Sequence, residues 1–139
     1  MDAEAFAKLW TQFSKDLKMH MEKELAPLTE SQLTVLEHLL THRKEQIKAS
    51  DLLQIMATTP AAVTTLLDRM ERNGLIERQR DEKDRRIVWI VMTNKGEQEG
   101  HRGRNIRTQF INHRLQRISE HNQKMLVLLL RKMVSEKAN

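Results

Sequence analysis

The sequence predicts a mainly α-helical α+β domain with one small β-hairpin. Hydrophobic residues make up 39% of the chain but aromatic residues only 4%, so the core must consist of Leu, Ile, Val, Met and Ala, a composition that favours helices. Apolar residues recur at helical spacing along most of the chain, and only residues 75–92 combine β-prone stretches with a polar turn. We therefore expect residues 1–139 to form a single domain with its own core.

The first two helices are indicated by an apolar stripe, a proline and a capping motif. A helix that begins near Ala3 and ends before Pro27 has apolar residues at steps of three and four: Phe6, Leu9, Trp10, Phe13, Leu17 and Met21. Thr29 is followed three positions later by Gln32, which is the capping-box arrangement of a helix start. The second helix has a broad apolar face that predicts burial on more than one side, formed by Leu33, Val35, Leu36, Leu39 and Leu40.

A short extended segment and a short helix follow. We expect residues 46–48 to be extended, and Ser50 is a candidate N-cap for a helix of about two turns that ends at Met56. With the helix that follows, it forms a helix-turn-helix pair.

The next helix has start and stop signals in its sequence. Thr59 followed by Pro60 fits an N-cap and a first helical position, where proline has no intrahelical hydrogen bond to lose. Asn73 and Gly74 end the helix, because both tolerate the left-handed backbone conformation that terminates helices. Its inward face is formed by Val63, Leu66, Leu67 and Met70.

The hairpin and two further helices complete the predicted fold. Residues 75–80 and 87–92 are β-prone stretches separated by the polar turn "DEKDRR". Thr93 caps a long helix, a break at residues 119–122 ends it, and residues 123–137 form a last helix. The stripe of the long helix consists of Ile106, Phe110, Ile111, Leu115 and Ile118.

A helix-turn-helix followed by a charged hairpin is the element order of a winged helix-turn-helix, here spanning residues 29–93. A helix can enter the DNA major groove only if its outward side chains allow a close approach and can read base edges. The outward side chains of the 60–73 helix are small or polar: Thr59, Ala61, Ala62, Thr64, Thr65, Asp68 and Arg69. An ordinary amphipathic helix with a small-residue surface is the alternative.

The hairpin tip carries the long cations expected of a wing. Lys83, Arg85 and Arg86 could reach the minor groove or the phosphates beside it. We expect Asp81 and Asp84 to hold the arginines in place, with Asp84 and Arg86 on the same side of an extended segment. A merely solvated tip is the alternative.

The order of elements and two motifs together resemble the MarR family of bacterial transcription regulators. The first motif is the DKDRR-like turn followed by apolar β residues and an LTxxG-like segment, with Asp84, Arg86, Met92, Thr93 and Gly96. The second is "DRMERNGLIER", residues 68–78, at the join between recognition helix and wing. The likeness extends over nearly the whole chain.

The resemblance implies a homodimer whose two winged lobes bind successive major grooves of a pseudo-palindromic operator. It implies that Thr59, Thr64 and Thr65 occupy recognition-helix contact positions and that Arg86 is the minor-groove arginine. Thr65 stands where many members have a long polar residue, which changes the base-reading pattern. Met92 replaces the usual leucine, a swap that conserves volume.

The terminal helices support a dimer independently of the resemblance. We expect residues 1–26 and 94–139 to form the dimerisation region, because their apolar stripes exceed what one small lobe can bury. The last helix is the most apolar, with Met125, Leu126, Leu128, Leu129, Leu130, Met133 and Val134.

Charge and residue usage favour a polyanionic partner and exclude several other classes. The net charge is +5, which is compatible with double-stranded DNA. The absence of cysteine excludes disulfides and thiol chemistry by this chain. No apolar run approaches the ~18 residues of a membrane span, so we expect a cytoplasmic protein with no membrane partner. No group of residues supports catalysis.

Several further features have two interpretations each. His38 and His42 could bind a metal from one helix face, but we expect solvated histidines, no metal and no cofactor. The arginines of residues 102–117 are expected to form a solvated face rather than phosphate contacts. Gly96, Gly100 and Gly103 indicate close helix packing. Four methionines either fill the core or line the pocket of a small-molecule effector: Met19, Met21, Met56 and Met70.

We therefore predict a sequence-specific DNA-binding transcriptional regulator that acts as a repressor. The rival hypothesis is a winged-helix protein-interaction module, in which the basic wing binds an acidic protein surface.

Overall fold

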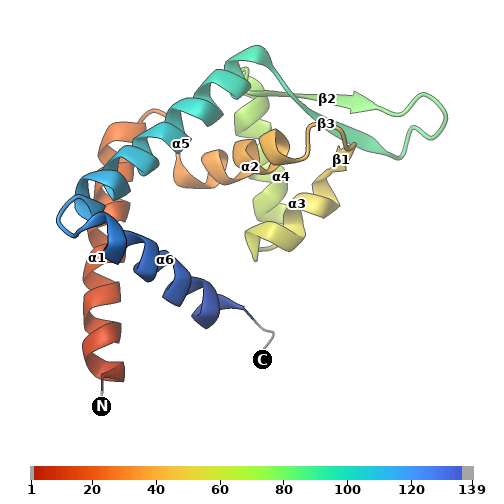
Figure 1. The fold of residues 1–139 in the computed structure, drawn as a ribbon. Helices are drawn as coiled ribbons and strands as arrows, with labels where there is room; N and C mark the ends of the chain where they lie inside the picture. Colours follow the sequence, from red (N-terminus) through yellow and green to blue (C-terminus); the bar gives the residue numbers. More distant parts are fainter. Residues whose placement is uncertain (1, 136–139) are drawn as a thin grey trace.

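The computed structural model describes residues 2–135 and confirms a mainly helical fold with a small antiparallel sheet. The two terminal helices and the end of α5 lie at one end of the molecule, and the β2–β3 hairpin projects from the other (Figure 1). The elements, in chain order, are α1 (Ala3–Leu25), α2 (Glu30–Thr41), β1 (Ile47–Lys48), α3 (Ala49–Met56), α4 (Pro60–Arg72), β2 (Ile76–Arg80), β3 (Val88–Met92), α5 (Asn94–Leu115) and α6 (Glu120–Val134).

Most of the predicted helix signals are confirmed. Thr29 and Gln32 form the reciprocal capping box of α2. The hydroxyl of Thr59 accepts a hydrogen bond from the third residue of α4, and Thr93 caps α5 in the same way. Gly74 has a φ of 75° in the turn after α4, a conformation that glycine adopts without strain.

The predicted N-cap of α3 is wrong. Ser50 lies inside the helix, and the cap is Lys48, whose backbone N–H donates to the carboxylate of Asp51 at 2.8 Å. The carboxylate of the third helical residue binds the backbone N–H of the N-cap residue, which is the half of a capping box that needs no hydroxyl at the cap, so the helix can begin before Ser50.

The start of the last helix was also predicted too late. Ser119 caps α6 and accepts from the backbone N–H of Asn122, so the helix begins at Glu120 rather than Gln123. The break therefore lies at residues 116–119, between the end of α5 at Leu115 and the start of α6, about three residues earlier than predicted. The predicted end of this helix at Lys137 lies outside the described residues.

The sheet contains one strand more than the predicted hairpin. Its order is β1-β3-β2, with Ile47 opposite Ile90 in one pair and Ile76 opposite Met92 in the other. All pairings are antiparallel. β1 has only two residues, too few for a periodic pattern, but its Ile47 is buried and fixes the loop after α2 to the base of the wing.

The hydrophobic core lies between α2, α4, the sheet and the C-terminal half of α1. The largest fully buried side chains are Met21, Leu25, Val35, Leu36, Leu52, Leu67, Met70 and Ile76. The N-terminal half of α1 contributes nothing to this core, because Phe6, Leu9 and Trp10 are exposed. None of the helices within residues 2–135 is long and apolar enough to span a membrane.

The three glycines of α5 are sites of close packing, as predicted. A Cβ atom on Gly100 would lie 2.7 Å from a methyl carbon of Leu40, and one on Gly103 would lie 2.5 Å from a methyl carbon of Leu33. Both contacts are with α2, so α5 can approach that helix only because these positions lack side chains.

The expected solvated arginine face of residues 102–117 is wrong for most of its members. Arg107 forms a two-point ion pair with Glu37 of α2, and Arg114 bonds Asp16 of α1. Arg102 donates to the carbonyl of Leu25 at the end of α1. These guanidinium groups connect α5 to its neighbours, a use that charge density in the sequence does not indicate.

Candidate nucleic-acid interface

One face of α4 consists of small or polar exposed side chains. Val63, Leu67 and Met70 are buried on the inner face, as predicted, with Leu66 partly buried at its margin. On the outer face Thr59, Ala61, Ala62, Thr64, Thr65 and Arg69 are all exposed. The first two turns of α4 therefore present short, exposed side chains, so another surface can approach the helix closely.

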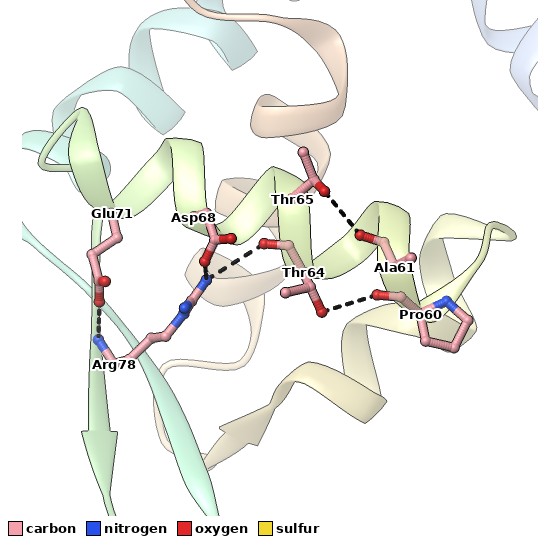
Figure 2. A network of polar contacts seen from close by, with 7 residues as sticks. All are labelled: Pro60, Ala61, Thr64, Thr65, Asp68, Glu71 and Arg78. Carbon is pink, nitrogen blue, oxygen red and sulfur yellow. Dashed lines mark hydrogen bonds and ion pairs between the residues drawn. The ribbon is translucent and has the colours of Figure 1, made fainter.

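The two outer threonines use part of their hydrogen-bonding capacity within the helix. The hydroxyl of Thr64 donates to the carbonyl of Pro60 at 3.0 Å, and that of Thr65 donates to the carbonyl of Ala61 at 3.1 Å (Figure 2). Each oxygen remains an acceptor, and both residues are exposed. Thr64 and Thr65 therefore present an acceptor and a methyl to an approaching base edge, rather than a free donor.

A network that the sequence analysis missed joins the outer face of α4 to the wing. The guanidinium of Arg78 on β2 donates to Asp68 at 2.5 Å and to the backbone carbonyl of Thr64 at 3.5 Å (Figure 2). The backbone N–H of Arg78 donates to Glu71 at 3.1 Å. The network was missed because the pairs are 7 to 14 residues apart and depend on how β2 folds back along α4.

Asp81 organises the wing tip, but not through an arginine as expected. Its carboxylate accepts from the backbone N–H groups of Lys83 and Asp84, at 3.0 and 2.9 Å, and from the indole Nε1 of Trp89 at 3.1 Å. The prediction that Asp81 pairs with an arginine is therefore wrong. Asp81 instead closes the turn by accepting hydrogen bonds from the backbone N–H groups two and three residues after it, as aspartates commonly do in turns.

The predicted pair of Asp84 and Arg86 is present. The backbone N–H, Nε and Nη2 of Arg86 all donate to the Asp84 carboxylate, at 3.0 to 3.1 Å. These hydrogen bonds lower the pKa of Asp84 and raise that of Arg86. The Arg86 side chain is nevertheless 90% exposed, so Asp84 directs it outward from the tip without covering it.

Several cations around α4 and the wing have no partner within the described chain. Among residues 2–135, the side chains of Arg69, Arg72, Lys83 and Arg85 form no hydrogen bond or ion pair. Arg80, by contrast, donates to the backbone carbonyl of Arg85 across the hairpin at 2.9 Å. The surface beside the small-residue face of α4 is therefore rich in unpaired positive charge.

The four methionines considered for an effector pocket have different environments. Met21 and Met70 are buried in the core, whereas Met19 is exposed. Met56 is half-buried and lines an open hollow of about 790 Å³ between α2, the α3–α4 turn and α4. Of the four methionines, Met56 is the one that lines this hollow.

His38, in the last turn of α2, and His42, which caps the end of that helix, have their ring centres 4.1 Å apart. Burial and the neighbouring His42 lower the pKa of His38. Within residues 2–135, no three or more potential ligands gather as a metal site would require. The two rings are thus a pair on one helix face without a third ligand.

The order of the wing tip should depend on pH through Asp81. Hydrogen bonds from the backbone of Asp84 and from Trp89 lower the pKa of Asp81 below its ordinary value of 3.8. A lowered pKa means that the charged carboxylate stabilises the folded turn at higher pH, and that this contribution is lost as the pH falls through the lowered pKa. In a Trp10→Phe background, Trp89 emission should stay constant from neutral pH to 5 and change only below 3.8.

An Asp81→Asn variant is the control for this titration. Its Trp89 emission should already be altered at neutral pH, and it should lack the acid transition. A transition near pH 6.5 in the parent would instead attribute the change to histidine.

The structure combines a helix-turn-helix, whose second helix has an outer face that another surface can approach closely, with a following hairpin that carries unpaired cations. This combination defines the winged helix-turn-helix class of DNA-binding proteins. Comparisons with known proteins agree. The model of the MarR family matches residues 28–88. The chain is 30% identical to the transcriptional regulator HosA of Escherichia coli O157:H7, over 82% of this chain and 83% of HosA.

Two further relatives lead to the same family. The transcriptional repressor MdtR of Bacillus subtilis is 34% identical, over 64% of this chain and 55% of MdtR. The solved structure of a MarR family protein from Bacillus stearothermophilus is 29% identical, with a TM-score of 0.81, over 94% of this chain and 91% of that one. The chain belongs to the MarR family and is a DNA-binding transcriptional regulator, not an enzyme, as its sequence predicted.

Proposed function

We propose that the protein acts as a homodimeric repressor that binds a pseudo-palindromic operator in double-stranded DNA. The small-residue face of α4 beside the cationic wing carries this proposal, because a helix and a flanking hairpin of this chemistry fit a major groove and the adjacent backbone or minor groove. The naming of MdtR as a repressor supports the direction of regulation.

The dimer is supported by the apolar surface at the end of the molecule away from the wing. Every side chain from Met125 to Leu129 on α6 is 40% exposed or more, and Leu9 on α1 is 70% exposed. Contiguous exposed apolar surface of this kind normally marks an interface. We assign residues 1–26 and 94–139 to dimerisation and residues 29–93 to the DNA-binding lobe.

Each predicted site residue receives a role in this arrangement. Thr59, Ala61, Thr64, Thr65 and Arg69 face the major groove, where threonine and alanine methyls can contact thymine and Arg69 can bind phosphate. At the wing, Arg86 enters the minor groove and Lys83 and Arg85 bind phosphates, while Asp84 directs Arg86.

Regulation by a small molecule is also part of the proposal. An effector must favour one separation of the two lobes over another, because a ligand indifferent to that separation changes nothing. Because the target is bacterial DNA, we place the protein in the cytoplasm.

The function can be tested by selecting bound duplexes from random DNA with the purified protein and measuring affinity at several salt concentrations. We expect an inverted-repeat sequence, and affinity that falls steeply as salt rises because lysine and arginine displace counterions from phosphates. Failure to retain any duplex at low salt would favour the rival protein-interaction module.

Thr64→Ala should change sequence preference more than nonspecific affinity. The variant loses both the hydroxyl acceptor and the γ-methyl group that Thr64 presents to the base edges, and the loss of one base contact costs roughly 1–3 kcal/mol on the preferred site. Competition binding with the selected operator and its single-base variants measures the shift. Equal losses on operator and random DNA would mean that Thr64 contacts only the DNA backbone.

A further inference from the structure

Arg78 occupies a position between the two proposed DNA-reading elements. It is the third residue of β2, and its guanidinium reaches back to the outer face of α4, where it contacts Asp68 and the carbonyl of Thr64 (Figure 2). Its side chain is 28% exposed, compared with 90% for Arg86. Arg78 is therefore committed to contacts within the protein, unlike the cations of the wing tip.

We propose that Arg78 is a positioning residue for DNA recognition: acting through Asp68, it sets the angle between α4 and the wing. This inference rests on the proposed function, in which α4 lies in the major groove while the wing reaches the neighbouring minor groove. Neither Arg78 nor Asp68 needs to contact a base for this role.

The geometry of the hairpin explains why this angle depends on Arg78. Leu75 and Ile76 are buried and anchor the base of β2, and Gly74 has a φ of 75° in the turn before it. Beyond them, Arg78 forms the outermost hydrogen-bonded contact between β2 and α4 within the described residues. From Arg78 to Lys83 the hairpin extends by five residues with no further bond to α4.

A small change in angle at the base becomes a large displacement at the tip. With a rise of ~3.3 Å per residue, the tip lies roughly 15 Å beyond Arg78, so a rotation of about 10° would move it by nearly 3 Å. Such a displacement exceeds the tolerance of a hydrogen bond. If the Arg78 contact were lost, the wing tip would therefore no longer be held in the position that lets it reach the minor groove while α4 lies in the major groove.

Electrostatics point to the same role. Asp68 lies on the outer face of α4, where an unpaired carboxylate would repel a polyanion. Arg78 neutralises that carboxylate, and the bond from its backbone N–H to Glu71 fixes the strand beneath it. The Asp68–Arg78 pair therefore removes the repulsion between the outer face of α4 and DNA without adding net positive charge to that face.

The test compares Arg78→Met, Arg78→Lys, Asp68→Asn and the Arg78→Met/Asp68→Asn double variant with the unmodified protein. Affinity is measured on the selected operator and on random duplex, each at four salt concentrations. Arg117→Ala, which removes an exposed arginine just after the end of α5, is the matched control for loss of charge. Thermal unfolding followed by circular dichroism identifies temperatures at which each variant is folded.

We expect each single variant to reduce the ratio of operator to random-DNA affinity about tenfold. The double variant should lose no more than Arg78→Met alone, because both act through one pair. The slope of log affinity against log salt should not change in Arg78→Met. Arg78→Lys keeps the charge and the long side chain, so it remains informative if Arg78→Met does not fold.

Three results would overturn the proposal. A salt slope in Arg78→Met that is smaller by about one would identify a direct phosphate contact. Fully additive losses in the double variant would separate Arg78 from Asp68, and an unchanged affinity ratio in the single variants would remove any role in recognition. If the unmodified protein selects no DNA at all, it is the proposed function that fails instead.

Discussion

Arg86→Ala should weaken operator binding at low salt by about tenfold or more, the loss expected when a groove-inserted arginine is removed. Arg86 is the wing cation best placed to contact DNA, because two hydrogen bonds to Asp84 hold its guanidinium while its side chain remains exposed. A preorganised arginine loses little rotamer freedom on binding, so its contribution should be large. Fluorescence anisotropy with a labelled operator measures the change.

Arg117→Ala is the control for this variant, because it removes the same charge near the end of α5, away from the wing. It should leave operator affinity close to that of the unmodified protein. If Arg86→Ala bound the operator as tightly as this control, the assignment of the wing to the minor groove would be wrong.

Gly96→Ala should destabilise the protein by about 3 kcal/mol, at the upper end of overpacking effects. A Cβ atom at this position would lie 2.1 Å from the backbone carbonyl oxygen of Leu75, and a backbone atom cannot rotate away as a side chain can. The same turn is fixed by bonds from Thr93 to Gly74 and from Lys95 to Asn73. Urea unfolding followed by circular dichroism, at one protein concentration throughout, measures the loss.

Two alanine variants on the same helix define the size of this effect. Gly100→Ala meets a terminal methyl of Leu40, which can shift, so a smaller loss of about 1 kcal/mol is expected. Thr108→Ala changes an exposed position and should be close to neutral. A Gly96→Ala variant as stable as Thr108→Ala would show that α5 does not pack against the α4–β2 turn in this way.

The fold could be predicted largely because its signals are local. The capping box of Thr29 and Gln32, the Thr59–Pro60 start of α4 and the Gly74 stop each depend on residues within a few positions of one another. The errors arose where alternatives were equally local: Ser50 is a good capping residue, but the Asp51 carboxylate satisfies the N–H of Lys48. The extended segment at residues 46–48 was predicted and is β1, but its place in the sheet was not, because it depends on pairing with a strand more than forty residues away.

The candidate site was predictable in its residue types but not in its connections. The exposed face of α4 and the Asp84–Arg86 pair follow from helix periodicity and from a spacing of two on an extended segment. The partners of Asp81 and Arg78 do not, since each depends on how the hairpin folds over itself or over α4. The same reason explains Arg107, whose partner Glu37 is on another helix. Charge density in a sequence does not distinguish a free cation from one that joins two elements.

The central claim is that two copies of this chain together place two α4 helices in successive major grooves of one operator. Hydroxyl-radical footprinting of the selected duplex, combined with the mass of the complex from sedimentation, tests it most directly. We predict two protomers per duplex and two symmetry-related protected regions separated by about 34 Å or a multiple of that spacing. A single protected region with one bound protomer would contradict the claim.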